Sequence, residues 1–434
     1  MLLAPDFSLD EYEVSPRNGF LPGSPPLQCL PNPYYAPWET VAQNLTESIR
    51  NGTIRKAVDS LPVLSTSHLQ TKPEWRRAYV VLSYLTHAYV WGGEIPKDIL
   101  PPAISVPYLE VSRYLELPPV ATYAALNLWN FSTTSPNADL TCADNLNVTL
   151  SYTGTKDEEW FFMISVAMEA RGAQVIELML DTIQAVVVGD DQRITAYLHQ
   201  ISEGFHELAR ILERMYEKNQ PAVFFHQLRP YLAGSKNMAS AGLPSGLFYD
   251  QGNGKGEWLQ YSGGSNAQSS LIQTFDIFLG VEHSHMGNPT KAELPKAKMG
   301  KTPYIQEMRN YMPGPHRRFL EMLTRNANVR QYALSCKLGT PVRDAYNAAV
   351  MSLGSFRDKH IQIVTRYIIM AAKLPPPESA PVSLNLASST QTQMKDVDSN
   401  EKVSAGVSGT GGTDLIPFLK QTRDDTKAAA NYAD

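Results

Sequence analysis

The stretch AYNAAVMSLGSFRDKHIQIVTRYIIMAA, residues 345–372, constrains the fold of this chain more than any other. Thr340 and Pro341 before it are the residue types of an N-cap and of a first helical position, and Pro375 after it stops a helix. Residues at intervals of three and four predict one buried stripe: Val350, Leu353, Phe356, His360, Val364 and Tyr367. We therefore expect a long helix with one face in the core.

His360 is the only histidine in that stretch. An imidazole in an apolar wall is costly unless its nitrogens are satisfied. One interpretation is a core histidine bonded to a backbone carbonyl, and this helix alone favours it. The other is an axial ligand of haem iron, because haem iron is commonly held by one histidine in an apolar pocket. Both interpretations stay open at this point.

The composition is that of a globular protein of 434 residues, 43% of them hydrophobic. The net charge of −5 gives no support for binding to nucleic acid or to an anionic membrane. Cys29, Cys142 and Cys336 are far apart and form no disulfide framework. The first residues are acidic and lack the basic start of a signal peptide, and no apolar run is long enough to cross a membrane. We expect a cytoplasmic protein.

The fold is predicted to be all-α, because long alternations of Val, Ile and Thr are absent. Residues 1–118 are expected to form a lead-in and a small helical domain, and 119–377 a large helical domain. Residues 378–408, rich in Ser, Thr, Gln and Asn, are expected to be a disordered loop, and 409–434 a lid and helix that dock back. Helices are predicted over 39–60, 73–92, 119–131, 158–188, from Asp190 or Asp191 to about 215, and over 223–233, 268–282, 303–312, 315–326 and 328–336.

Conventional catalytic motifs do not fit this sequence. There is no GxSxG nucleophile turn, and no carboxylate pair stands out for glycoside chemistry. The HSH of His283 to His285 has no third metal ligand nearby. The glycine-rich stretches 252–256 and 409–412 lack the GK[ST] ending and the preceding strand of a phosphate loop. His87 is interpreted as a packing residue.

Three segments remain unusual for a plain scaffold. In AVFFHQLRPYLAG, residues 222–234, Phe225 and Arg229 lie one helical turn apart. They are either core aromatics beside a surface arginine, or an aromatic platform with a carboxylate clamp. The second segment is YSGGSNAQSSLIQTFDIFLG, residues 261–280, whose glycines permit a close backbone approach. The third is GTGGTDL, residues 409–415, which suits a mobile lid.

Four segments together resemble the indoleamine 2,3-dioxygenase family: SGGSNAQSSLIQTFDIFLG, YIQEMRNYMPGPHRRFLEML, SFRDKHIQIVTRYI and GTGGTDLIPFLK. HAYVWGG and LPPAISVPYLEVSRYLELPPV resemble its smaller domain, so the match runs from roughly residue 15 to 425. The resemblance implies two all-helical domains, the larger binding haem b. It implies that ferrous haem and O2 cleave the indole C2–C3 bond of L-tryptophan to N-formyl-L-kynurenine, the first step of the kynurenine route towards NAD. An electron donor and a monomer are also implied.

The resemblance assigns the cofactor side of the site. His360 matches the proximal iron ligand, and Arg357, one turn earlier, matches an arginine that reaches a haem propionate. Asp276 matches the acidic partner of that arginine. Gly264 and Ser265 match a loop against the haem, with Ser265 also near the substrate.

The substrate side is assigned in the same way. Phe224 matches the aromatic residue that packs on the indole, Phe225 its neighbour, and Arg229 the partner of the substrate carboxylate. Three further residues match the distal pocket and the lid: Tyr123, Ser165 and Thr410. No distal histidine is matched, so Ser165 is not expected to act as a general base.

Departures from the family pattern indicate a fungal branch. His226 and Gln227 replace smaller or apolar residues, and the stretches 132–157, 283–302 and 378–408 are longer than in the animal enzymes. Three alternatives stay open: a haem protein of the same fold that binds or senses O2, a non-haem helical interaction protein, and a tryptophan 2,3-dioxygenase. The Phe224 and Arg229 clamp and the lid argue against an oxygen carrier.

Overall fold

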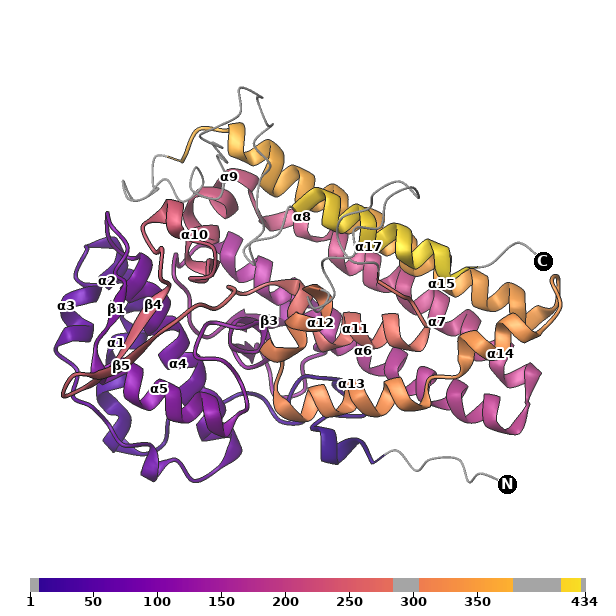
Figure 1. Ribbon diagram of the computed structural model, residues 1–434, viewed down its shortest axis with the longest axis horizontal. Helices are drawn as coiled ribbons and strands as arrows, with labels where there is room; N and C mark the ends of the chain where they lie inside the picture. Colours follow the sequence, from indigo (N-terminus) through magenta and orange to yellow (C-terminus); the bar gives the residue numbers. More distant parts are fainter. Residues whose placement is uncertain (1–7, 284–303, 378–414, 431–434) are drawn as a thin grey trace, which may run out of the picture.

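The computed structural model describes residues 8–283, 304–377 and 415–430. Helices dominate these residues, so the predicted all-α class is confirmed (Figure 1). The predicted loop 378–408 and most of the predicted lid lie outside the described residues. No described helix is long and apolar enough to cross a membrane.

The first third of the chain forms a group of short helices around one long helix. Its elements are η1 (Leu9–Tyr12), η2 (Pro33–Tyr35), α1 (Ala36–Gln43), α2 (Leu45–Arg50), α3 (Ile54–Asp59), η3 (Thr66–His68), α4 (Lys72–Trp91) and α5 (Pro102–Tyr114). Helix α4 begins at a capping box of Thr71 and Glu74. The prediction of a single helix over 39–60 is wrong. Helical structure is interrupted at Asn44 and again near Gly52, which has a φ of +71°.

The rest of the chain contains several long helices that run roughly along one another, with shorter helices around them (Figure 1). They are α6 (Lys156–Val188), α7 (Asp191–Glu213), α8 (Met215–Lys218), α9 (Pro221–Val223), η6 (Phe224–Leu228), α10 (Arg229–Leu232), α11 (Ser270–Phe278), α12 (Tyr304–Met308), η9 (Arg309–Tyr311), α13 (Gly314–Asn326), α14 (Val329–Ser335), α15 (Pro341–Val364), η10 (Thr365–Met370), η11 (Ala371–Lys373) and α17 (Leu415–Ala429). Helix α15 packs against both α7 and α17. The stretch 345–372 is therefore central to the bundle.

The predicted caps are largely confirmed. Asp190 caps α7 by accepting a hydrogen bond from the amide of Arg193. Thr340 and Pro341 hold the N-cap and N1 positions of α15, but the Thr340 hydroxyl donates to the carbonyl of Lys337 and does not cap the helix.

Strands form two small sheets that the sequence did not reveal. Strands β4 (Leu247–Gly252) and β5 (Lys255–Leu259) form a hairpin, and β4 pairs in parallel with β1 (Ile99–Leu100). The glycine-rich stretch 252–256 is the turn of this hairpin and the start of β5. Strands β2 (Phe131–Thr133) and β3 (Leu146–Val148) form the second sheet. The helix predicted over 119–131 is wrong, because only a π-helical turn, η4 (Ala124–Leu128), precedes β2.

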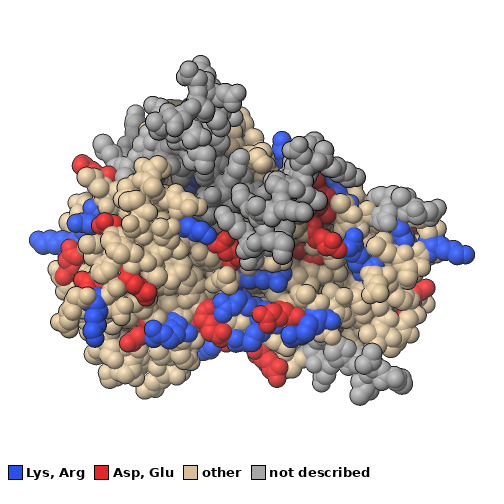
Figure 2. Space-filling model, in the orientation of Figure 1, with Lys and Arg blue, Asp and Glu red and all other residues tan. Residues whose placement is uncertain are grey.

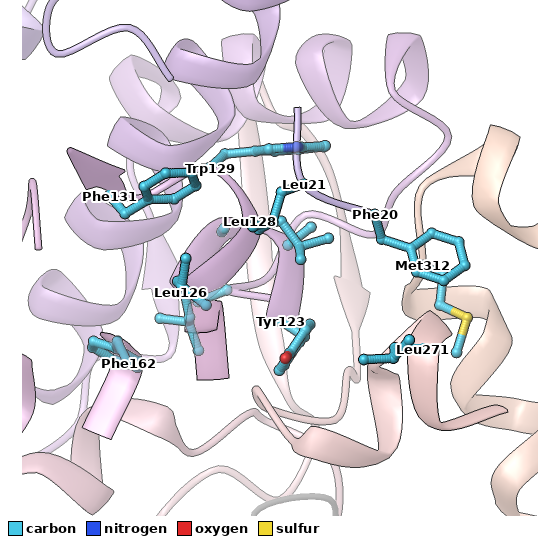
Figure 3. Close-up of a cluster of buried hydrophobic side chains, with 14 of the residues drawn as sticks. Phe20, Leu21, Tyr123, Leu126, Leu128, Trp129, Phe131, Phe162, Leu271 and Met312 are labelled. Carbon is cyan, nitrogen blue, oxygen red and sulfur yellow. The ribbon is translucent and has the colours of Figure 1, made fainter. Parts of the chain in front are cut away.

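The lead-in and the hairpin connect the two parts of the molecule. Phe20 packs on Phe319 and His316 of α13, with ring centroids 5.5 and 4.8 Å apart. Figure 3 shows side chains that converge in one cluster. They come from the lead-in, from η4 and its flanks, from α6, from α11 and from the segment before α13: Phe20, Leu21, Tyr123, Leu126, Leu128, Trp129, Phe131, Phe162, Leu271 and Met312. The boundary at residue 118 stays a prediction, and β4 pairs with a strand that precedes it, β1.

Two sets of buried polar contacts anchor α4, the first to α1 and the second to residues that follow the group of short helices. Arg77 of α4 forms two hydrogen bonds with the carboxylate of Glu39, at 2.9 and 2.6 Å. His87 accepts from the amide of Ala121 and bonds the carbonyl of Tyr231, and burial lowers the pKa of its imidazole to about 4. His87 is thus the packing residue that was predicted.

Lysine and arginine side chains alternate with acidic ones along the lower part of the face in Figure 2.

Candidate functional site

One cavity of about 230 Å³ lies between α6, α10, α11, α15 and α17. Most of the side chains around it are apolar. Nine predicted site residues line it: Tyr123, Ser165, Phe224, Arg229, Gly264, Ser265, Asp276, Arg357 and His360. Phe225 is buried beside the cavity and does not line it, and Thr410 lies outside the described residues.

His360 projects from α15 into the wall of this cavity. Burial, helped by the nearby positive charge of Arg357, lowers the pKa of the imidazole to about 4. The ring is therefore neutral at pH 7, which is the form that can donate a lone pair to a metal. Among the described residues the structure gives His360 no hydrogen-bond partner, so the interpretation as a core histidine bonded to a carbonyl has no support there.

Arg357 lies one turn before His360 and forms a buried ion pair with Asp276 of α11. Asp276 also accepts a hydrogen bond from Nε2 of His283, at 2.9 Å. Burial by itself would raise the pKa of Asp276, but Arg357 and His283 outweigh it and hold the pKa below its usual value. Nε of Arg357 is buried and has no hydrogen-bond partner. One donor of this guanidinium is thus left for a further acceptor.

Arg229 is buried at the start of α10, close to the aromatic pair. Burial lowers the pKa of its guanidinium to about 10, so it stays charged at pH 7. The guanidinium lies 5.3 Å from the ring centre of Phe225, which makes Phe225 a support of Arg229. Phe224 faces the cavity and packs against Phe161, with ring centroids 4.8 Å apart. The predicted clamp is therefore a cation and an aromatic face on one short helical segment.

The glycines of the 261–280 segment allow backbone to pass very close to backbone. A Cβ on Gly263 would overlap the carbonyl oxygen of Leu232 and the amide of Gly234. A Cβ on Gly264 would overlap the side chain of Leu126, which also lines the cavity. Larger residues at these positions would displace the loop that carries Ser265.

Three π-helical turns contribute to the cavity wall. They are η4, η6 and η10, which supply Leu126 and Asn127, Phe224, and Tyr367 and Ile368. Single π turns often occur at functional sites, because the extra residue re-aims neighbouring side chains. Sequence periodicity did not reveal these turns.

Helix α17 covers one side of the cavity with Leu415, Phe418, Leu419 and Thr422. It packs along α15, and Arg423 and Lys427 both pair with Asp358 of that helix, at 3.1 and 2.8 Å. The C-terminal segment thus returns to the helix that carries His360.

Glu169 is a cavity residue that sequence reasoning missed. Its carboxyl accepts hydrogen bonds from the hydroxyls of Tyr123 and Ser269, at 2.9 and 2.7 Å. Ser165 and Glu169 lie one turn apart on α6 and line the same cavity. A carboxylate on the buried face of an apolar helix was the available signal.

The donor groups fit the haem that the resemblance implied. A neutral imidazole suits iron, and a guanidinium with one unpartnered N–H suits a propionate. Haem iron takes its protein ligand from a single side chain, so a cluster of ligands is not required. The described residues contain no group of three or more His, Cys, Asp or Glu side chains that could hold a bare metal ion.

Comparison with known proteins extends this picture. The profile of the indoleamine 2,3-dioxygenase family matches residues 8–429. The chain is 42% identical to indoleamine 2,3-dioxygenase qulI of Penicillium citrinum, over 98% of this chain and 89% of the relative. It is 37% identical to the indoleamine 2,3-dioxygenase of Saccharomyces cerevisiae, over 98% and 94%. It is also 37% identical to 6-hydroxytryptophan 2,3-dioxygenase fscD of Fusarium equiseti, over 96% of both chains. The resemblance is confirmed: the chain belongs to the indoleamine 2,3-dioxygenase family of haem-containing oxidoreductases.

Proposed function

We propose that this chain uses haem b to insert both atoms of O2 across the indole C2–C3 bond of L-tryptophan, giving N-formyl-L-kynurenine. The observation that supports this most is that His360, Arg357 and Arg229 line one apolar cavity. A haem enzyme that acts on an amino acid needs an iron ligand, a propionate partner and a carboxylate partner. These three side chains have the matching chemistry.

The haem, when bound in its ferrous state, supplies the iron that binds and activates O2. His360 would hold this iron. Arg357 would bind a propionate through its unpartnered Nε, while Asp276 keeps the guanidinium in place. The backbone at Gly264 and Ser265, which line the cavity, would lie against the ring.

The substrate would be held by the clamp on η6 and α10. Arg229 would pair with the carboxylate, and Phe224 would pack on the indole. His360 is the only histidine among the described residues that line the cavity, so no second imidazole is at hand there as a general base. We infer that the chain contributes mainly orientation and the exclusion of water, through its apolar walls and α17.

The decisive experiment follows the product. The purified protein is reduced without oxygen, then mixed with O2 and L-tryptophan, and N-formylkynurenine is measured by absorbance and mass. We expect a Soret band and product formation. A stable ferrous-oxygen spectrum without product would favour the O2-binding alternative, and a colourless preparation would favour a non-haem protein.

A parallel assay addresses the choice of indole. One relative is named for 6-hydroxytryptophan, and the cavity contains Glu169 and Ser165, which could contact a ring hydroxyl. L-tryptophan and 6-hydroxy-L-tryptophan are compared by kcat/KM. We expect the higher kcat/KM for L-tryptophan. A higher kcat/KM for 6-hydroxy-L-tryptophan would show that L-tryptophan is not the preferred substrate.

The wider setting also belongs to this proposal. We propose a cytoplasmic monomer that needs an electron donor to keep the haem ferrous and that feeds the supply of NAD precursors. Light scattering of the loaded protein tests the oligomeric state. Turnover with and without a chemical reductant tests the need for an electron donor.

A further inference from the structure

Glu169 has an unusual environment for a carboxyl group. Its side chain is 1% exposed and lies in the wall of the cavity. The carboxyl group receives two hydrogen bonds, from the hydroxyls of Tyr123 and Ser269, and Oε1 accepts both of them. Oε2 is buried and has no hydrogen-bond partner. The described residues form no ion pair with it, and a buried carboxylate without a cation is costly.

Burial also shifts the ionisation of this group. It raises the pKa of Glu169 to about 7, although the hydrogen bonds from Ser269 and Tyr123 lower it. Because Oε1 already accepts two hydrogen bonds, the proton of the neutral acid belongs on Oε2. The neutral acid therefore has a donor that nothing among the described residues accepts.

The cavity is also lined by other charged and titratable groups. They come from the segment before η4, from α10, α11, α12 and α15 and from η10: Tyr123, Arg229, Asp276, Tyr304, Arg357, His360 and Tyr367. The residues of α17 that line the cavity are not ionisable. Arg357 is already paired with Asp276, so an ionised Glu169 would add a negative charge beside any carboxylate that the cavity binds.

We propose that Glu169 is a positioning residue that, as the neutral acid, donates a hydrogen bond from Oε2 to a carboxylate of the molecule bound in the cavity. This inference rests on the proposed function, which supplies two such carboxylates, a haem propionate and the carboxylate of the amino acid. Ionisation of Glu169 replaces this hydrogen bond with repulsion. Retention of the anionic ligand therefore falls as the pH rises through the ionisation of Glu169.

The protonation state is tested first, by infrared spectroscopy of the full-length protein as isolated. We expect a carbonyl band of a protonated carboxyl that fades around pH 7 and is missing in Glu169→Gln. The control is Glu177→Gln, an exposed glutamate of the same helix, which should leave the band unchanged. Ser269→Ala removes a hydrogen bond that favours the ionised form, so it should move the fading to higher pH. Absence of any such band in the wild type at pH 6 would overturn the proposal.

Ligand retention is tested next, in two arms on the haem-loaded protein. One arm measures the rate of haem transfer to apomyoglobin, and the other the Kd of L-tryptophan from the haem spectrum. For one group that titrates near pH 7, linkage predicts that retention weakens about tenfold between pH 6 and pH 8. The glutamine of Glu169→Gln stays neutral and keeps a hydrogen-bond donor. This variant should therefore lose the pH dependence of ligand retention, and at every pH its retention should match that of the wild type at pH 6 within a few fold.

The two arms identify the carboxylate. A change confined to haem transfer indicates a propionate, and a change confined to the Kd indicates the amino acid. Equal pH dependence in wild type and Glu169→Gln, in both arms, would overturn the proposal. So would a loss of affinity in Glu169→Gln at pH 8, because that would show an ionised Glu169 accepting from a cationic ligand. Failure of the proposed function is recognised separately, by a missing Soret band or missing product, and the infrared result does not depend on either.

Discussion

Arg357 of α15 and Asp276 of α11 form an ion pair across 81 positions of sequence, one helical turn from His360. Both side chains are largely buried, at 11% and 6% exposed. Asp276 is held from a second side by His283. The orientation of Arg357 towards the cavity therefore depends on a helix that a sequence pattern cannot place beside it.

Removal of Arg357 should destabilise the protein strongly. In Arg357→Ala the carboxylate of Asp276 stays buried without its guanidinium, which costs about 3–5 kcal/mol of unfolding free energy. Urea unfolding of wild type and variant measures this. Arg50→Ala breaks the exposed pair with Glu47, 67% and 65% exposed, and should cost less than about 1 kcal/mol.

The same pair has a pH signature. The pKa of Asp276 is lower in the folded protein than in the unfolded chain. The ionised carboxylate therefore makes its full contribution to the free energy of unfolding above the unfolded pKa of about 3.9, and this contribution is lost as the pH falls through the folded pKa. The stability gap between wild type and Arg357→Ala should therefore narrow below about pH 4. A gap that widens on acidification would contradict the assigned pair.

Gly263→Ala should lower the free energy of unfolding by about 1–3 kcal/mol, because the added Cβ overlaps the backbone of Leu232 and Gly234. Thermal unfolding measures the loss. Gly23→Ala is the matched control, since its Cβ would meet nothing within 4 Å and its φ is ordinary. Equal Tm values for the two variants would show that the backbone around residue 263 accommodates the added Cβ with little loss of unfolding free energy.

His360→Ala should lose haem or its normal ferric spectrum, and added imidazole should restore a Soret band. The exposed His199→Ala is the control and should keep the wild-type spectrum. The folded pKa of about 4 adds a pH test. Since the unfolded imidazole takes a proton near pH 6.5, stability should fall from about pH 6.5 towards pH 4, and less so in His360→Ala. A native-like spectrum in His360→Ala would refute iron ligation.

Arg229→Ala should lower kcat/KM for L-tryptophan about 10- to 100-fold, the effect of a lost hydrogen bond to a charged group of about 1.5–3 kcal/mol. KM should rise and kcat should fall, because the clamp orients the substrate as well as binding it. Steady-state kinetics of the haem-loaded variants measure this, with the exposed Arg210→Ala as control. An unchanged kcat/KM would reject the clamp.

Ser165→Ala should keep turnover within about tenfold of the wild type. Ser165 lines the cavity, but a serine hydroxyl is a weak base, and general acid–base catalysis would contribute about 100-fold or more. The measurement is the initial rate at saturating L-tryptophan, with the haem content checked by its spectrum. A complete loss of turnover with haem retained would assign Ser165 a chemical role.

Local patterns were sufficient for the long helices. Helix α6 spans Lys156–Val188 where 158–188 was predicted, and α13 and α14 match their predicted ranges to within one residue. Periodicity and capping act over a few residues, so they can be read directly from the chain. The hairpin of β4 and β5 was missed, because its pairing with Ile99–Leu100 depends on residues far away in sequence.

By itself, the sequence determined the helical class, the family and the residue types at the site, including His360, Arg357 and Arg229. Only the tertiary structure decided that these residues share one cavity, that Phe225 supports Arg229 from outside it, and that Glu169 shares its wall. The physical reason is that burial and pairing of polar groups come from contacts between distant helices. Helix periodicity shows which face is buried, but not what lies opposite.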